Sequence, residues 1–247
     1  MALPKIFKPF KCDLLRCGSD NDGGYLISKK TILDSKSLIS FGILDDCTFE
    51  KDFQEMTKTN TLCFDRINYK NYWKKRIYND LGAAVFNLNY NFFKNTVKKY
   101  IAFKKFFKSK KNILENEIIR EKSLTKILNN YKNKIQKPFL FKIDIEGSEY
   151  RILDEIIEFS DSMTGVIIEF HDLDLHLDKV VNFLEKLNFK ITHIHGNNFE
   201  RVIDDIPIVL EVTLEKNPVI EESFSTLPNQ LDQACNADLK DIDLKFN

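Results

Sequence analysis

The chain has 247 residues, 43% of them hydrophobic, which suits a single folded domain with a real core. Its 37 Lys and Arg balance its 37 Asp and Glu, so the overall charge predicts no nucleic-acid partner. Without a run of about 18 apolar residues or a signal-peptide core, neither an integral membrane segment nor export is expected, which favours a cytoplasmic location.

Strands and helices alternate along the sequence, a pattern that predicts a mainly parallel sheet. Residues 20–25 read Asp-Asn-Asp-Gly-Gly-Tyr, which predicts a hairpin tip before the sheet. Residues 68–137 are expected to be mostly helical, with a short strand at 83–88. Further helices are expected at 48–57 and 175–187. Strands are expected at 37–41, 61–64, 139–145, 165–170, 190–195 and 209–214, the last a candidate for an antiparallel strand.

The segment 139–150 is the most informative part of the sequence. A short apolar run ends in Asp144 and Glu146, and a helical pattern follows Gly147 and Ser148. We expect the hydroxyl of Ser148 to cap that helix. Because side chains two residues apart on a strand share a face, both carboxylates should point the same way at the sheet edge where ligands bind. Such a pair indicates a ligand, a proton-transfer role or a metal.

A glycine turn follows the strand at 37–41. Gly42 lets the backbone approach a ligand at the amino end of the next helix, although the full G-x-G-x-x-G pattern is missing. Asp65 ends the following strand, the usual place for a carboxylate that holds ribose hydroxyls. Each feature is common in proteins that bind no nucleotide, but their order within one β-α-β unit favours nucleoside binding.

Histidines end two of the later strands at the same predicted edge. On their strand His193 and His195 share a face, as do Glu169 and His171. One interpretation is a general base with a supporting carboxylate. Another is a metal site made of histidine and carboxylate ligands. Structural hydrogen bonding is the third.

Aromatic residues and lysines alternate over residues 92–111. This pattern suits an anionic substrate or a membrane surface. The alternative, which the spacing favours, is an amphipathic helix that packs Phe93, Val97, Tyr100 and Phe107 inward and leaves its lysines in solvent.

These motifs, in this order, resemble the FkbM family of S-adenosylmethionine-dependent methyltransferases. The most specific match is Lys-Ile-Asp-Ile-Glu-Gly-Ser-Glu at 142–149, and the resemblance spans about residues 17–214. It implies a Rossmann-like class I methyltransferase fold of the α/β class, a mainly parallel sheet with helices on both faces. Residues of about 89–116 fall outside the resemblance and are predicted to form a helical insertion within a single domain, 1–247. Further matches lie at 21–25, 40–42, 45–46, 49–50, 123–128, 169–171 and 195–198.

The resemblance implies S-adenosylmethionine as cofactor and O-methylation of a small molecule or sugar, in a bacterial capsule or surface polysaccharide pathway. A sugar hydroxyl is a weak acid, so a base or a divalent metal is expected beside the acceptor, although the sequence does not require a metal. The candidate catalytic residues are His171, Glu146 and His195. The candidate cofactor-binding residues are Asp22, Gly23, Phe41, Gly42, Asp45, Asp65 and Asp144.

Two other functions stay open from the sequence. One is a metal-dependent hydrolase that uses Asp144, Glu169, His171 and His195. The other is a non-catalytic binding module of the same fold. The sequence indicates neither the oligomeric state nor which hydroxyl of the acceptor is methylated.

Overall fold

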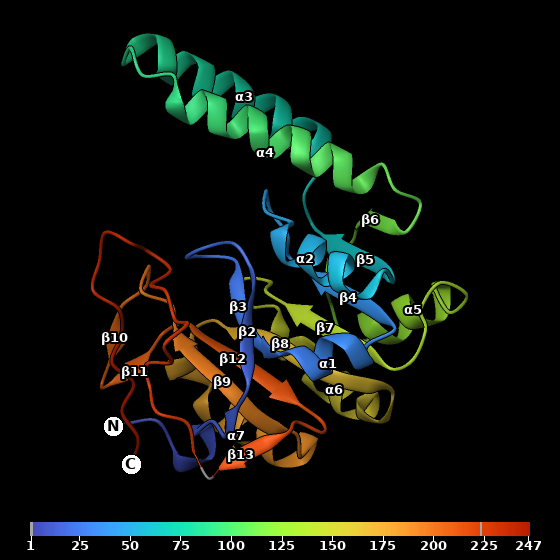
Figure 1. Cartoon of the computed structure of the whole chain (residues 1–247), viewed down its shortest axis with the longest axis vertical. Coiled ribbons are helices and arrows are strands. Elements are labelled where there is room, and N and C mark those ends of the chain that lie inside the picture. Colours follow the sequence, from blue (N-terminus) through green and yellow to red (C-terminus); the bar gives the residue numbers. More distant parts are fainter. Residues whose placement is uncertain (1, 223) are drawn as a thin grey trace.

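The computed structural model describes residues 2–222 and 224–247 and is built around one large sheet (Figure 1). The seven strands of this sheet are β4 Ser37–Phe41, β5 Asn60–Asp65, β6 Asn112–Asn116, β7 Phe139–Ile143, β8 Met163–Phe170, β9 Lys190–Gly196 and β12 Leu210–Glu215. They lie in the order β6-β5-β4-β7-β8-β12-β9. The first five are parallel, and β12 is antiparallel to both of its neighbours. The predicted mainly parallel sheet and its antiparallel last strand are therefore confirmed.

Helices cover both faces of the sheet (Figure 1), because successive side chains on each strand point to opposite sides. Leu38 and Leu140 pack on the face that carries α1 and α2. Their chain neighbours Ile39 and Phe141 pack on the other face, with α5, α6 and α7. All four side chains are fully buried, as expected for strands covered on both sides. The covering helices are α1 Lys29–Asp34, α2 Thr48–Thr57, α5 Ser123–Asn130, α6 Leu153–Glu158 and α7 Leu173–Leu187.

Short elements complete the domain. The predicted hairpin tip is confirmed, since β2 and β3 pair antiparallel on either side of it. The last residues of the chain lie against β9, where Asp232 and Asp241 contact two of its histidines. These short elements are η1 Lys5–Phe7, β1 Lys11–Cys12, β2 Leu14–Gly18, β3 Gly24–Ser28, η2 Glu149–Arg151, η3 Ser160–Ser162, β10 Val202–Ile203, β11 Ile206–Pro207 and β13 Ile220–Glu222.

A pair of long helices, α3 Tyr69–Phe86 and α4 Asn91–Phe107, projects from the domain beyond β5 and β6 (Figure 1). The predicted strand at 83–88 is wrong: Ala83 and Ala84 are strong helix formers, and Ala84 is buried within the helix pair. The predicted helical segment at 89–116 is only partly helical, since α4 ends at Phe107 and 112–116 forms β6 beside β5. Its description as an insertion stays a prediction.

The chain turns sharply after β7, and this corrects the expected placement of two carboxylates. The strand ends at Ile143, so Asp144 and Glu146 do not alternate on a strand. Glu146 has a φ of +54° and Gly147 a φ of +84°, which forms a left-handed turn. The Glu146 side chain is 70% exposed. The expected Ser148 cap is also wrong, because its hydroxyl makes no capping bond to the described residues of η2.

None of the helices in residues 2–222 and 224–247 is both long enough and apolar enough to cross a lipid bilayer.

Candidate active site

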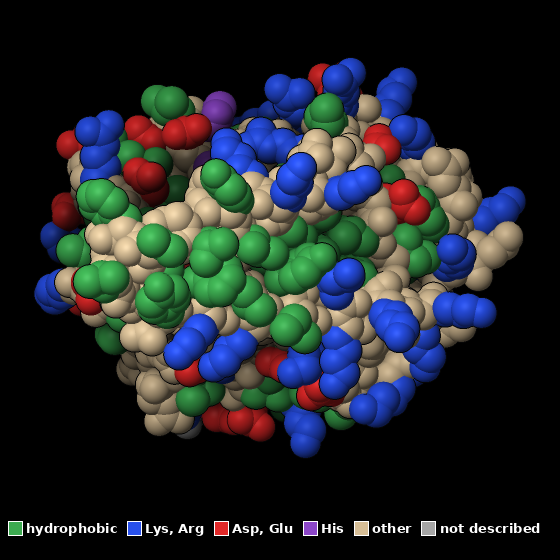
Figure 2. Space-filling view, turned by 90° about the horizontal axis from the view of Figure 1, so that it is seen from above, with side chains coloured by type: hydrophobic (Ala, Val, Ile, Leu, Met, Phe, Trp, Pro, Cys, Tyr) green, Lys and Arg blue, Asp and Glu red, His purple; other side chains and the backbone are tan. Residues whose placement is uncertain are grey.

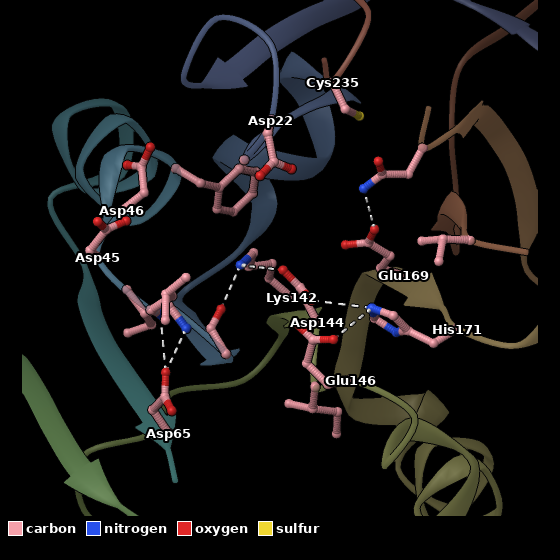
Figure 3. A pocket seen from close by; sticks show the side chains of 18 of the residues that line it. Asp22, Asp45, Asp46, Asp65, Lys142, Asp144, Glu146, Glu169, His171 and Cys235 are labelled. Carbon is pink, nitrogen blue, oxygen red and sulfur yellow. Dashed lines mark hydrogen bonds and ion pairs between the residues drawn. The ribbon is translucent and has the colours of Figure 1, made fainter. Parts of the chain in front are cut away.

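A cavity of about 980 Å³ lies at the carboxyl ends of β4, β5, β7 and β8 (Figure 3). Open α/β sheets bind their ligands at this edge, and the volume suits a cofactor-sized molecule. Carboxylates dominate the wall of the cavity, and apolar side chains line one part of it. The acidic residues of the wall are Asp20, Asp22, Asp45, Asp46, Glu50, Asp65, Glu117, Asp144, Glu146, Glu169, Asp172 and Glu200.

Asp65 holds the glycine turn that follows β4 through hydrogen bonds to the backbone of that turn. Gly42 has a φ of +73°, and a Cβ there would lie 1.6 Å from a backbone oxygen, so only glycine fits. Asp65 Oδ2 accepts the backbone N–H groups of Ile43 and Leu44, both at 3.0 Å, and the Tyr69 hydroxyl at 2.8 Å. The ribose role of Asp65 stays a prediction, and a ribose hydroxyl would share or replace these bonds.

Lys142 is a buried cation beside this turn, and sequence analysis gave it no role. Its Nζ donates to the Gly42 carbonyl at 2.8 Å, lies 3.9 Å from Asp144 Oδ2 and lies 5.5 Å from the Tyr25 ring centroid. Burial lowers the pKa of Lys142, but Glu50 and Asp144 raise it more, so the pKa ends above its ordinary value. Its amine therefore stays charged at neutral pH.

Several carboxyls crowd the floor of the cavity (Figure 3). Burial raises the pKa of Glu169 well above its ordinary value, and Asp144 and Glu211 raise it further. Asn197 Nδ2 donates to Glu169 Oε1 at 2.8 Å, which opposes that rise. Burial also raises the pKa of Asp144, against the lowering effect of Lys142. Burial and the acidic neighbours of Glu169 thus favour its neutral form, in which a carboxyl group can donate a hydrogen bond.

His171 follows β8 and is held by Glu149. Its backbone N–H donates to Glu149 Oε1 at 2.8 Å, and its Nδ1 lies 3.3 Å from the same oxygen. The other ring nitrogen, Nε2, lies 3.7 Å from Glu146 Oε2 and 4.0 Å from Asp144 Oδ1. Burial lowers the pKa of His171, but Glu149, Asp144 and Glu146 raise it above its ordinary value. Sequence analysis found His171 but missed Glu149, which it noted only as the last residue of the 142–149 motif.

His195 lies outside the wall of the cavity. Its Nδ1 is 3.3 Å from Glu211 Oε2, and its Nε2 is 3.1 Å from both carboxylate oxygens of Asp241. Burial lowers its pKa, but these two carboxylates raise it to about 9. His193 and His195 share a face as predicted, with their ring centroids 6.4 Å apart, and His193 Nε2 lies 2.7 Å from Asp232 Oδ1. Both histidines thus have structural carboxylate partners.

The remaining predicted residues divide into two groups. Asp22 and Gly23 line the cavity from the β2–β3 hairpin, and Asp45 lines it from the loop before α2. Phe41 has no exposed surface and stacks on Phe64 in the core, so its side chain lies away from the cavity. Phe41 is therefore not part of the cavity wall.

Among the residues that the structure describes, two groups of side chains lie close enough together to hold a metal ion. Within each group, each residue offers one ligand atom, and these atoms lie within 4.8 Å of one another. The first group, at the cavity, is Asp144, Glu169 and His171, and the second, beside it, is His195, Glu211 and Cys235. The four residues of the proposed hydrolase site therefore do not form one cluster, because His195 belongs to the second group.

The sheet order and the cavity at its carboxyl edge define a Rossmann-like class I methyltransferase. A model of the methyltransferase FkbM domain matches residues 44–191, more than half of the chain. The chain therefore belongs to the FkbM methyltransferase family, and its general activity is S-adenosylmethionine-dependent methyl transfer. A search of curated proteins finds no significant match.

Several solved structures are similar to the chain at low identity. An rRNA methylase from Streptococcus thermophilus is 12% identical, with a TM-score of 0.42 over 76% of this chain and 90% of that one. TrmK of M. capricolum, in complex with S-adenosyl-homocysteine, is 15% identical, with a TM-score of 0.37 over 82% of this chain and 69% of that one. A Methanococcus jannaschii fibrillarin pre-rRNA processing protein is 10% identical, with a TM-score of 0.42 over 88% of each chain. These similarities carry no information on the substrate of this chain.

Proposed function

We propose that this protein is an O-methyltransferase that acts on a hydroxyl group of a sugar. The observation that carries the proposal is the position of His171 at the cavity. Glu149 holds one nitrogen of its ring, and the other nitrogen faces the cavity beside Asp144 and Glu146. This is the arrangement that a base for a hydroxyl proton requires.

The chemistry of the cavity wall fits the cofactor. S-adenosylmethionine carries a sulfonium and an ammonium group, and carboxylates such as Asp22 and Asp144 complement both charges. Ile67, Ile118 and Ile119 offer apolar surface for an adenine ring. The residues that would hold the cofactor are Asp22, Gly23, Gly42, Asp45, Asp65 and Asp144.

The cofactor, when bound, supplies an electrophilic methyl group. The chain must align the acceptor hydroxyl and remove its proton. Because Nδ1 of His171 donates to Glu149, Nε2 is the nitrogen that accepts this proton. Asp144 and Glu146 then stabilise the charged ring.

A polar acceptor fits the part of the cavity around Glu169. The carboxyl of Glu169 and the amide of Asn197 are neighbours there, and both can hydrogen-bond to hydroxyl groups. These groups support a sugar, on a nucleotide or on a polymer end. A role in capsule or surface polysaccharide synthesis rests on the resemblance to the family.

A divalent cation is the second candidate for activating the hydroxyl. Asp144, Glu169 and His171 bring one ligand atom each within 4.8 Å of the others, and such ligands suit a divalent metal. His171 would then be a ligand and not the base. The alternative of a metal-dependent hydrolase is disfavoured, since the chain belongs to a methyltransferase family.

Calorimetric titration with S-adenosylmethionine tests the cofactor, and mass spectrometry of a sugar-nucleotide pool incubated with protein and cofactor tests the reaction. We expect binding, and a methylated sugar as product. Binding without methylation of any sugar or small molecule would favour the non-catalytic module. Activity that a chelator removes and Mg²⁺ restores would favour the metal over the base.

A further inference from the structure

The helix pair α3–α4 and the residues that follow it are far more basic than the rest of the chain. Residues 69–111, named here the basic hairpin, contain twelve Lys or Arg and one acidic residue, Asp80. Their net charge is therefore +11, and the rest of this neutral chain carries −11. The chain is neutral overall, yet the basic hairpin within it is strongly cationic.

Most of this charge is not neutralised by nearby acids. Asp80 is used within the hairpin, where it accepts from Arg76 Nε at 3.2 Å and from the Thr96 hydroxyl. Every lysine of the basic hairpin is exposed. Within the described part of the chain, only Arg76 and Lys99 of this group form ion pairs. Lys111 Nζ donates to the Lys58 carbonyl at 2.8 Å, and the lysines that remain are exposed to an anionic partner.

The same hairpin exposes large apolar side chains. Phe86, Leu88 and Phe92, at the turn between the two helices, are 89%, 83% and 73% exposed. Figure 2, which looks down on the hairpin, shows a band of hydrophobic side chains flanked by lysine and arginine. An apolar surface of this kind, rimmed by charge, marks an interaction site. The other large apolar residues that the hairpin exposes are Tyr78, Leu81, Val85, Tyr90 and Ile101.

The exposed band is not needed to hold the hairpin in place. Trp73, Phe103 and Phe106 are buried and pack its base against Ile43 and Cys63. The rings of Trp73 and Phe103 lie 5.4 Å apart. The hairpin is therefore a fixed platform, and its exposed apolar side chains have no role in that packing.

We propose that the basic hairpin docks on an anionic lipid membrane. Its lysines would lie at the lipid phosphates, while Phe86, Leu88 and Phe92 would enter the boundary between headgroups and acyl chains. A nucleic acid would use the lysines but leaves aliphatic side chains such as Leu88 unexplained. Pairing of two hairpins from two copies is opposed by the repulsion between two charges of +11.

The docked hairpin would lie beside the rim of the cavity. It begins four residues after Asp65, and Lys99 of α4 lines the cavity. Acceptors carried on membrane lipids would thus reach the cavity directly. This consequence rests on the proposed methyl transfer, whereas the docking itself does not.

Co-sedimentation with vesicles tests the proposal on the full chain. We expect phosphatidylcholine vesicles that contain phosphatidylglycerol to bind it at least about tenfold more tightly than phosphatidylcholine alone, with the difference reduced by salt. An apolar variant (Phe86→Ser, Leu88→Ser, Phe92→Ser) should lose at least about tenfold in affinity. A basic variant (Lys94→Gln, Lys98→Gln, Lys105→Gln) should lose at least about tenfold as well.

Matched surface changes elsewhere serve as controls. Leu175, on α7, is 75% exposed, and Leu175→Ser should leave vesicle binding unchanged. The triple change Lys29→Gln, Lys132→Gln, Lys186→Gln removes equal charge outside the hairpin and should have a much smaller effect than the basic variant. Calorimetric binding of S-adenosylmethionine, measured in parallel, separates failure of the docking from failure of the proposed function.

Three results would overturn the docking. The first is equal binding to neutral and anionic vesicles at low salt. The second is wild-type vesicle binding by the apolar variant, especially if single-stranded RNA binds the chain more tightly than vesicles do. The third is a dimer in solution that the apolar variant converts to a monomer, because the band would then be an interface between copies.

Discussion

Nδ1 of His171 lies 3.3 Å from Oε1 of Glu149, a carboxylate whose side chain has no exposed surface. The same oxygen accepts the backbone N–H of His171, and the Tyr150 hydroxyl donates to the His171 carbonyl. Neighbouring residues of η2 thus fix both the backbone and the ring of His171. The sharp turn after β7 therefore has a function, because it brings η2 beside the end of β8.

His171→Ala should lower kcat by about 10²-fold or more, the range expected when a general base is lost. The affinity for S-adenosylmethionine should change little, since the ring faces the acceptor. Methyl-transfer kinetics and calorimetric titration measure the two effects separately. His176→Ala is a matched control, because the His176 ring packs on Tyr150 outside the cavity wall. Near-normal kcat of His171→Ala in metal-free buffer would leave Glu146 as the candidate base.

Glu149→Gln should test whether Glu149 acts through His171. Glutamine keeps a hydrogen-bond acceptor for Nδ1 but removes the charge that helps raise the pKa of His171, so that pKa should fall. Because the neutral ring is the base, the rising limb of kcat against pH should move to lower pH. We expect kcat to fall by about tenfold, since the charged ring is less stabilised. A loss of kcat with an unmoved pH profile would indicate a merely structural role.

Asp65→Ala should weaken S-adenosylmethionine binding at least about tenfold, because the bonds to ribose and to the Ile43 and Leu44 amides are lost together. Calorimetric titration measures the affinity, and thermal unfolding shows whether the fold is kept. Tyr69→Phe removes one partner of the same oxygen but keeps the carboxylate, and should bind the cofactor normally. Unchanged affinity in Asp65→Ala would rule out the ribose role.

The predictable part of the fold is the part with strong local patterns. The apolar run at 139–143 is buried on both faces, and α2 occupies the predicted 48–57. β6 was missed because Asn112, Glu115 and Asn116 give no apolar alternation, as is common for a strand at a sheet edge. A short window at 83–88 could not separate the end of a long helix from a strand.

The predictable part of the site depends on short-range signals as well. Asp65 and Asp144 were found because Asp65 ends β5, Asp144 follows β7, and both line the edge where ligands bind. Glu149 and Asp241 were missed because their partners lie 22 and 46 residues away in the chain. The pairing of His195 with the last residues of the chain exists only in three dimensions, so no local pattern could separate it from His171.

Lys142→Met should destabilise the protein by about 3–5 kcal/mol, because it leaves buried carboxyls without their cation. Burial raises the pKa of Glu50 and Lys142 lowers it, so the variant has an even higher Glu50 pKa. A carboxyl with a raised pKa stabilises the fold at acid pH and loses that contribution as pH rises. The deficit should therefore be larger at about pH 8 than at about pH 5 in urea unfolding. The double variant Lys142→Met, Glu50→Gln should recover much of the loss, and no recovery would contradict the coupling.

The free energy of unfolding should fall as pH rises from 6.5 to about 9. Over that range the unfolded chain releases the His195 proton, whereas the folded state still holds it between two carboxylates. A histidine whose pKa is raised in the folded state contributes its full stabilisation at pH values below its ordinary pKa of 6.5. It contributes none at pH values well above its folded pKa. The difference between the ordinary and the folded pKa of His195 corresponds to about 3 kcal/mol of stability. Urea unfolding across the range should show a smaller fall for His195→Gln, which should also be less stable at the acid end. Asp241→Asn should lower the folded pKa of His195, so the fall should end at lower pH and be smaller. Equal slopes in wild type and His195→Gln would show that another group titrates.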